Sequence, residues 1–196
     1  MPRFHVLCPV VPVPGLLALA EAGVEAVQVR DKDADDRALL AFATAAVAAL
    51  RPLGVRVILN DRVDLALAAG ADGVHLGAQD LPVSAARALA PTLLIGATCR
   101  SRAAAVAAAR EGADYAGVGP VFATTSKAGL PAPLGVEGLA EVTGVLPVVA
   151  IAGIDAGRVP AVLAAGAHGV AVLGAVTNAA DPPTAAREIA AALRAA

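Results

Sequence analysis

One short pattern recurs four times along the chain and constrains its fold more than any other feature. Each copy places a glycine between an alanine-rich stretch and an apolar run, at Gly23, Gly70, Gly112 and Gly166. Glycine is favoured at a helix C-terminus because it adopts the left-handed conformation without steric cost, and the apolar run that follows indicates a buried strand. The glycines lie about 40 to 55 residues apart, which is the length of two strand–helix units. Four such pairs predict eight units.

Eight strand–helix units favour a single (β/α)8 TIM barrel over residues 1–196. A doubly wound α/β sheet shares the alternation but needs fewer units, so closure into a barrel is the better interpretation. Strands are expected at Phe4–Cys8, Ala26–Arg30, Val55–Leu59, Gly73–Leu76, Leu93–Ala97, Tyr115–Val118, Val148–Ala152 and Val170–Leu173. Helices are expected at Leu16–Glu21, Asp36–Leu50, Val63–Ala69, Val83–Ala90, Arg102–Glu111, Val136–Thr143, Arg158–Ala165 and Pro183–Arg194.

Length and composition exclude several classes of protein. The 196 residues correspond to about one domain, and with 58% hydrophobic but only 2% aromatic residues the core must consist of Ala, Val and Leu. A net charge of -2 without a basic block argues against nucleic-acid binding. No run of eighteen apolar residues and no signal peptide is present, so a cytoplasmic protein without a membrane partner is expected. Cys8 and Cys99 are too few for a disulfide framework or a zinc cluster.

The segment from Tyr115 to Lys127 has the composition of a strand followed by an anion-binding loop. Tyr115 to Phe122 is apolar and uncharged, as expected of a strand covered on both faces. The hydroxyl groups of Thr124, Thr125 and Ser126 and the cation Lys127 then follow in sequence, and together they suit phosphate oxygens. A solvated loop is the alternative for this segment taken alone.

Polar residues also follow most of the other predicted strands, and in a barrel these positions converge on one rim. They are Gln28, Arg30, Asp31 and Lys32 after the second strand, Asn60 and Asp61 after the third, Gln79 and Asp80 after the fourth and Thr98 after the fifth. The seventh and eighth strands end at small residues, Gly153 and Gly174, whose backbone amides suit a phosphate.

The cations Arg30, Lys32 and Lys127 together with the carboxylates Asp61 and Asp80 suit a pyrophosphate–Mg²⁺ substrate. Magnesium prefers one or two carboxylates completed by phosphate oxygens and water, so two aspartates are enough. The alternative for each aspartate is a helix N-cap.

The other polar and aromatic candidates are weaker. His75 and His168 are interpreted as structural histidines, and Tyr115 and Phe122 as core residues. His5 falls within the first strand, and its side chain points into the barrel if the strand alternates as expected, but no partner can be named.

Four ordered motifs resemble the thiamine-phosphate synthases and their relatives, the thiazole tautomerases. The motifs are Val27–Lys32, Leu59–Asp64, Gly73–Asp80 and Gly117–Phe122 with its Thr124–Lys127, and the resemblance covers nearly the whole chain. It implies a transferase that joins a hydroxymethylpyrimidine diphosphate to a thiazole phosphate and releases pyrophosphate, with Mg²⁺ as cofactor. The reaction needs no nucleophilic side chain, because departure of pyrophosphate leaves a pyrimidine-stabilised cation.

The resemblance also implies roles for individual residues. Lys127, Arg30 and Lys32 are the catalytic cations, and Asp61 and Asp80 are the metal ligands. The substrate-binding positions are Gln28, Val29, Arg30, Asp31, Lys32, Asn60, Thr98, Thr124, Thr125, Ser126, Lys127, Gly153, Leu173 and Gly174.

This chain departs from the family pattern at several of these positions. Thr98 stands where serine is usual, Ser126 where threonine is usual, and Ala152 where a glycine is usual. Gly174 stands where serine is common, and the first unit lacks the usual aromatic residue.

Two other functions remain open. The first is a thiazole tautomerase, whose characteristic histidine falls at Pro120, a residue that cannot transfer a proton. The second is a non-catalytic protein that binds a phosphate ligand, and retention of both aspartates argues against it. Alanine-rich helix faces are compatible with a homo-oligomer.

Overall fold

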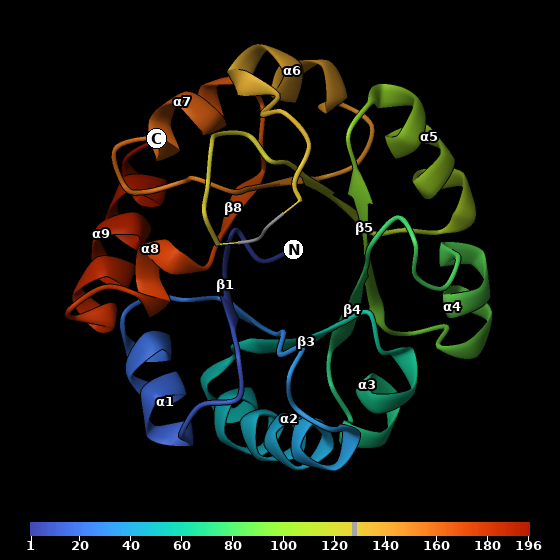
Figure 1. The fold of residues 1–196 in the computed structure, drawn as a ribbon, viewed down its shortest axis with the longest axis vertical. Helices are drawn as coiled ribbons and strands as arrows, with labels where there is room; N and C mark the ends of the chain where they lie inside the picture. Colours follow the sequence, from blue (N-terminus) through green and yellow to red (C-terminus); the bar gives the residue numbers. More distant parts are fainter. Residues whose placement is uncertain (127–128) are drawn as a thin grey trace.

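Eight parallel strands form a closed barrel, each followed by at least one helix (Figure 1). The structure is a computed structural model that describes residues 1–126 and 129–196. The strands are β1 Phe4–Cys8, β2 Ala26–Val29, β3 Arg56–Asn60, β4 Gly73–Leu76, β5 Leu94–Cys99, β6 Tyr115–Val118, β7 Val148–Ile151 and β8 Gly169–Val172. The helices are α1 Val13–Glu21, α2 Asp36–Leu50, η1 Arg51–Leu53, α3 Val63–Ala69, α4 Val83–Leu89, α5 Arg102–Glu111, α6 Gly135–Val142, α7 Val159–Ala164, α8 Gly174–Thr177 and α9 Pro182–Ala195. The predicted TIM barrel is confirmed.

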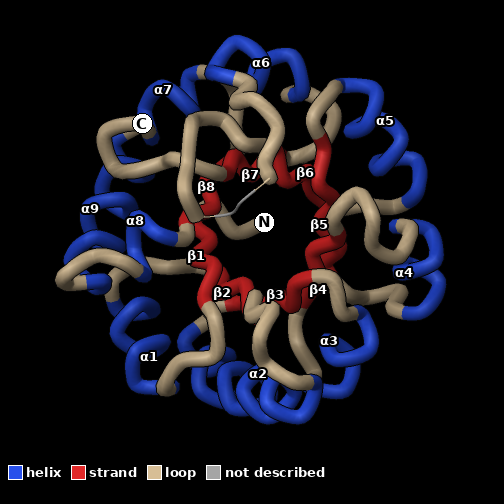
Figure 2. Tube along the Cα trace, in the orientation of Figure 1, coloured by secondary structure: helices blue, strands red, loops and turns tan. Residues whose placement is uncertain are grey.

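The strands pair in sequence order, and the ring closes where β1 pairs with β8 in parallel register, with Val6 opposite Val172. All eight predicted strands are present, and their ends agree with the prediction to within two residues. The strands form the inner ring and the helices surround it (Figure 2). The N-terminal residues cross one end of this ring, where His168 Nε2 lies 3.0 Å from the Met1 carbonyl oxygen and Arg3 Nε donates to the His168 carbonyl. Pro2 is buried there.

The four glycines of the repeated pattern all have a positive φ, between 65° and 99°. Gly70 and Gly112 end α3 and α5 in the left-handed conformation, as the pattern predicts. The structure adds two short helices that the sequence prediction does not include, η1 and α8. Both are a single turn, which is too short to produce an apolar period.

Two apolar layers hold the barrel together. The larger fills the space between the strands and the surrounding helices, and it contains both cysteines, which are buried and unpaired. The smaller lies inside the ring and consists of Leu7, Tyr115, Val149 and Ala171. Because the inner layer is small, the interior of the barrel remains hollow toward the carboxyl ends of the strands.

Glycines on β5 and β6 make room for two rings inside the barrel. A Cβ atom on Gly96 would lie 2.0 Å from Tyr115 Cζ, and one on Gly117 would lie 2.5 Å from His75 Cε1. Tyr115 is the only tyrosine of the chain, and it is 1% exposed. The small residues on β5 and β6 therefore determine where the rings of the barrel floor can lie.

No helix in the described part of the chain is long and apolar enough to cross a membrane.

Gly96→Ala is expected to lower the free energy of unfolding by about 2 kcal/mol, because overpacking a rigid interior costs about 1–3 kcal/mol. The control is Gly15→Ala in α1, where an added Cβ meets nothing within 4 Å and alanine is the better helix former, so the free energy of unfolding should stay level or rise by up to about 1 kcal/mol. Chemical denaturation of both variants measures the difference. Equal stabilities would show that Tyr115 moves away without cost.

Candidate active site

A cavity of about 800 Å³ opens at the carboxyl ends of the strands. It brings together thirteen residues that the sequence marks as site residues. They are Gln28, Arg30, Lys32, Asn60, Asp61, Asp80, Thr98, Thr124, Thr125, Ser126, Gly153, Leu173 and Gly174. Residues from seven of the eight strand ends or loops thus meet at one rim, as barrel geometry requires.

Two other predicted positions, Val29 and Asp31, do not line this cavity. Val29 is 2% exposed and belongs to the outer apolar layer. The carboxylate of Asp31 accepts hydrogen bonds from the backbone amides of Val10, Asp33 and Ala34, at 3.0–3.2 Å. These bonds, that of Asp33 above all, lower the pKa of Asp31 and fix the loop that carries Arg30 and Lys32. Lys127 lies outside the described residues.

Asp61 and Asp80 follow neighbouring strands, and neither caps a helix. The N-cap residues of α3 and α4 are Arg62 and Pro82, without a side-chain cap bond. Asp61 has a φ of 66°, an uncommon conformation for a residue with a side chain, and its amide donates to the His75 carbonyl at 2.8 Å. Asp80 Oδ2 accepts from the Gly77 amide at 2.6 Å. The N-cap alternative is therefore excluded for both.

The two carboxyl groups interact directly. Burial and then the neighbouring Asp80 raise the pKa of Asp61 to about 6, while Lys32 and Arg30 act in the opposite direction. Two carboxylates in contact repel each other when both are ionised, so a cation between them would be stabilised. No three His, Cys, Asp or Glu residues cluster as metal ligands within residues 1–126 and 129–196. A metal ion at this place would depend on the two aspartates plus oxygens from substrate and water.

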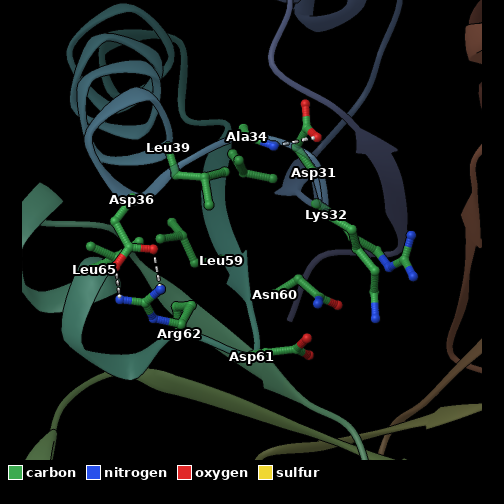
Figure 3. A pocket seen from close by; sticks show the side chains of 12 residues that line it. Asp31, Lys32, Ala34, Asp36, Leu39, Leu59, Asn60, Asp61, Arg62 and Leu65 are labelled. Atoms are coloured by element: carbon green, nitrogen blue, oxygen red, sulfur yellow. Dashed lines mark hydrogen bonds and ion pairs between the residues drawn. The ribbon is translucent and has the colours of Figure 1, made fainter.

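A second cavity of about 310 Å³ adjoins the first, between the loops that follow β2 and β3 (Figure 3). Four residues line both cavities: Arg30, Lys32, Asn60 and Asp61. In Figure 3 the Asp61 carboxylate points away from Arg62, whose guanidinium donates to Asp36 and, at 2.7–2.8 Å, to Asp64. Because Arg62 is paired with these two carboxylates, Asp61 remains available to the large cavity.

Neutral polar groups form the floor of the large cavity. His75 Nδ1 lies 3.1 Å from the Tyr115 hydroxyl, and His75 Nε2 lies 3.0 Å from Thr98 Oγ1. Burial lowers the pKa of His75 to about 4, so the imidazole is neutral at pH 7. The predicted structural role of His75 is confirmed by these bonds, but the residue also faces the cavity.

His5 also lines the floor, 5.7 Å from the Tyr115 ring between centroids. Its Nε2 lies 3.1 Å from the Pro2 carbonyl, which can only accept, so Nε2 carries the proton. Burial lowers the pKa of His5 to about 4, which leaves Nδ1 as an acceptor. His168, by contrast, binds the N-terminal backbone and does not line the cavity.

The cavity wall across from the loops after β2–β4 consists of closely packed backbone from the loops that follow β6, β7 and β8. A Cβ on Gly153 would lie 2.5 Å from the Ala123 carbonyl oxygen, and one on Gly174 would lie 2.9 Å from Ser126 Oγ. The Ser126 amide donates to Thr124 Oγ1 at 3.2 Å, which folds the loop onto itself. The hydroxyls of this loop therefore lie against the ends of β7 and β8.

Two arginines of the cavity were not predicted from the sequence. Arg100 donates to the carbonyls of Gly119 and Ala132, at 2.8 and 2.9 Å, and so joins both ends of the long loop after β6. Arg158 lies over the Phe122 ring, 4.7 Å from its centroid, and donates to the Gly153 carbonyl. Arg100 directly follows β5 but lies three residues beyond the end of the predicted strand, and Arg158 falls inside a predicted helix, so neither stands directly after a predicted strand.

Comparison with known proteins gives a consistent result. A family model described as thiamine monophosphate synthase matches residues 13–176. The thiamine-phosphate synthase of Anaeromyxobacter dehalogenans is 51% identical over 94% of this chain and 84% of that protein. The thiamine biosynthesis bifunctional protein ThiM/ThiE of Symbiobacterium thermophilum is 50% identical over 89% of this chain, which spans only 37% of that protein. The solved thiamine phosphate pyrophosphorylase from Pyrococcus furiosus superposes with a TM-score of 0.89 at 35% identity, over 98% of this chain and 96% of that one.

Asp61→Asn is expected to stabilise the metal-free protein more at pH 7.5 than at pH 4.5. The pKa of Asp61 is raised in the folded state, so its contribution to stability is complete below its ordinary pKa and is lost as the pH rises through about 6. Asparagine removes this loss. Urea denaturation of both proteins in EDTA at the two pH values measures the effect, and a difference that does not change with pH would contradict it.

Proposed function

Because this chain belongs to the thiamine monophosphate synthase family, a family of transferases, we propose that it condenses a hydroxymethylpyrimidine diphosphate with a thiazole phosphate, taken as its carboxylate tautomer. The products are thiamine phosphate and pyrophosphate. The observation that carries the proposal is the division of the large cavity into a neutral polar floor and a charged rim. Such a cavity suits substrates that combine an uncharged heteroaromatic ring with phosphate groups.

We assign the pyrimidine ring to the floor. Gln28 is 5% exposed, His5 and His75 are held neutral by burial, and all three face the cavity. Neutral donors and acceptors bind a pyrimidine without stabilising a competing anion at this position. His5 supplies a ring on the first strand, where the family's usual aromatic residue is missing.

We assign the diphosphate to the rim at β2–β4. Arg30, Lys32 and Asn60 contribute cationic and amide donors there, and Lys127 is the third proposed catalytic cation. These groups would neutralise charge as the bond to pyrophosphate breaks, and the closed floor would keep water from the pyrimidine cation until the thiazole nitrogen attacks. The fixed loop around Asp31 supports this assignment, because it holds both Arg30 and Lys32 in place. We therefore give Asp31 and the buried Val29 indirect roles.

The mutual repulsion of Asp61 and Asp80 makes their site suited to Mg²⁺. These two carboxylates would hold the ion, which when bound supplies positive charge beside the pyrophosphate. The thiazole phosphate is assigned to the opposite wall, with Thr124, Thr125 and Ser126 as hydroxyl donors and the backbone of Gly153, Leu173 and Gly174 as amide donors. The attacking thiazole and the departing pyrophosphate would thus lie on opposite sides of the cavity.

Pyrophosphate release with both substrates, with and without Mg²⁺, tests the proposal. Asp61→Asn and Asp80→Asn are each expected to lower Mg²⁺-dependent turnover by at least about tenfold, since each removes one charged ligand. Calorimetric titration of Mg²⁺ into each variant provides a readout independent of turnover. If both variants retained full activity and the Mg²⁺ affinity of the unmodified protein, the metal assignment would be wrong.

Pro120 separates the proposed synthase from a thiazole tautomerase. A prolyl ring has no titratable group, and Pro120 lines the cavity at the position implied for the tautomerase histidine. The protein supplied with the thiazole carboxylate alone should therefore isomerise it no faster than the buffer does. Rapid isomerisation without the pyrimidine diphosphate would favour the tautomerase, and binding without any turnover would favour a non-catalytic protein.

A further inference from the structure

Three contacts with neighbouring residues hold Arg158 beside the cavity, at the loop that follows β7. Its guanidinium carbon lies 4.7 Å from the centre of the Phe122 ring, which presents its face to the cation. Its Nη1 donates to the carbonyl of Gly153, and its backbone amide donates to Asp155 Oδ1 at 3.0 Å. The side chain therefore spans the loops that follow β6 and β7.

The charge of Arg158 is only weakly compensated. The nearest carboxylate is Asp155, with Nε and Oδ2 4.0 Å apart and side chains 47% and 59% exposed. The electrostatic attraction between two side chains as exposed as these is weak, because water screens it. An arginine side chain has five N–H donors. Among the described residues, the guanidinium of Arg158 donates one hydrogen bond, to the Gly153 carbonyl. Donors remain for a ligand.

The other described cations of the cavity follow other strands. Arg30 and Lys32 belong to the loop after β2, on the side assigned to the diphosphate. Arg100 uses its two terminal nitrogens for backbone carbonyls of the loop after β6. Among the described residues of the cavity wall built from β6 to β8, Arg158 is therefore the only cation.

We propose that Arg158 is a specificity-determining residue that binds an anionic group of the thiazole substrate. The inference rests on the proposed function, because it takes that wall as the thiazole side. A planar guanidinium pairs with an oxyanion through two parallel hydrogen bonds, and two groups of this substrate fit, its phosphate and its ring carboxylate. Gly153 and the loop hydroxyls bring neutral donors to the same wall, and Arg158 adds the charge that they lack.

The test compares Arg158→Gln and Arg158→Lys with Arg102→Gln as the control. Arg102 is also exposed and also donates to a backbone carbonyl, that of Thr143 at 2.9 Å, but it does not line the cavity. Arg158→Gln is expected to raise the KM for the thiazole substrate by about tenfold or more, the scale of a lost charge-assisted hydrogen bond, with the KM for the pyrimidine diphosphate within about twofold. Arg158→Lys should recover part of the loss, and Arg102→Gln should match the unmodified protein.

Two thiazole substrates identify the anion. If Arg158 binds the carboxylate, the effect of Arg158→Gln disappears with the decarboxylated thiazole phosphate, whereas an effect on both substrates assigns the phosphate. A KM of Arg158→Gln within twofold of the unmodified protein for both thiazole substrates overturns the proposal. An equal rise of KM for the thiazole and pyrimidine substrates also overturns it, since a merely structural arginine would affect both sites.

Calorimetric titration of the carboxylated thiazole phosphate, which carries both candidate anions, keeps this question separate from catalysis. Absence of pyrophosphate release by the unmodified protein would refute the proposed function, and the titration would still compare affinities with and without Arg158. Weaker binding to Arg158→Gln than to Arg102→Gln supports the role of Arg158. Equal binding, or no binding to the unmodified protein, refutes it.

Discussion

Closure of the ring between β1 and β8 is the interaction on which the rest of the structure depends. The Val170 amide donates to the Arg3 carbonyl at 2.8 Å, and the strands approach so closely that a Cβ on Gly169 would lie 2.1 Å from the same oxygen. Without this contact the sheet would have two edges, and residues from β2 and β8 would not share a cavity. The first and last strands therefore position the site although neither carries its charged residues.

The cavity separates two kinds of polar chemistry by depth. At the floor, desolvation keeps both histidines neutral. At the rim, Lys32 and Arg30 partly offset the repulsion between Asp61 and Asp80. Charged groups are retained where water and ligands can compensate them, and neutral groups occupy the interior, where an uncompensated charge would be costly. The same gradient gives a substrate with one charged and one uncharged end a single favourable orientation.

Much of this architecture could be predicted from the sequence because it depends on local rules. The left-handed glycines at Gly70 and Gly112 end helices whatever surrounds them, and apolar runs identify the strands. Residues at the carboxyl ends of strands, such as Asn60 and Thr98, could also be placed, since strand geometry determines their position. The roles of Arg100 and Arg158 could not, because a long side chain reaches the cavity only through the conformation of a loop. Likewise the positive φ of Asp61 has no sequence signal.

The scarcity of aromatic residues has an optical consequence. The chain has no tryptophan and one tyrosine, and the hydroxyl of Tyr115 is bonded to His75 at the cavity floor. Ultraviolet emission and near-ultraviolet dichroism of the whole protein therefore originate mainly from one phenol at the bottom of the site. A ligand that reaches the floor changes the polarity around that phenol, while a ligand that stays at the rim leaves it untouched. The protein thus contains its own label-free reporter of how deeply a molecule has entered the barrel.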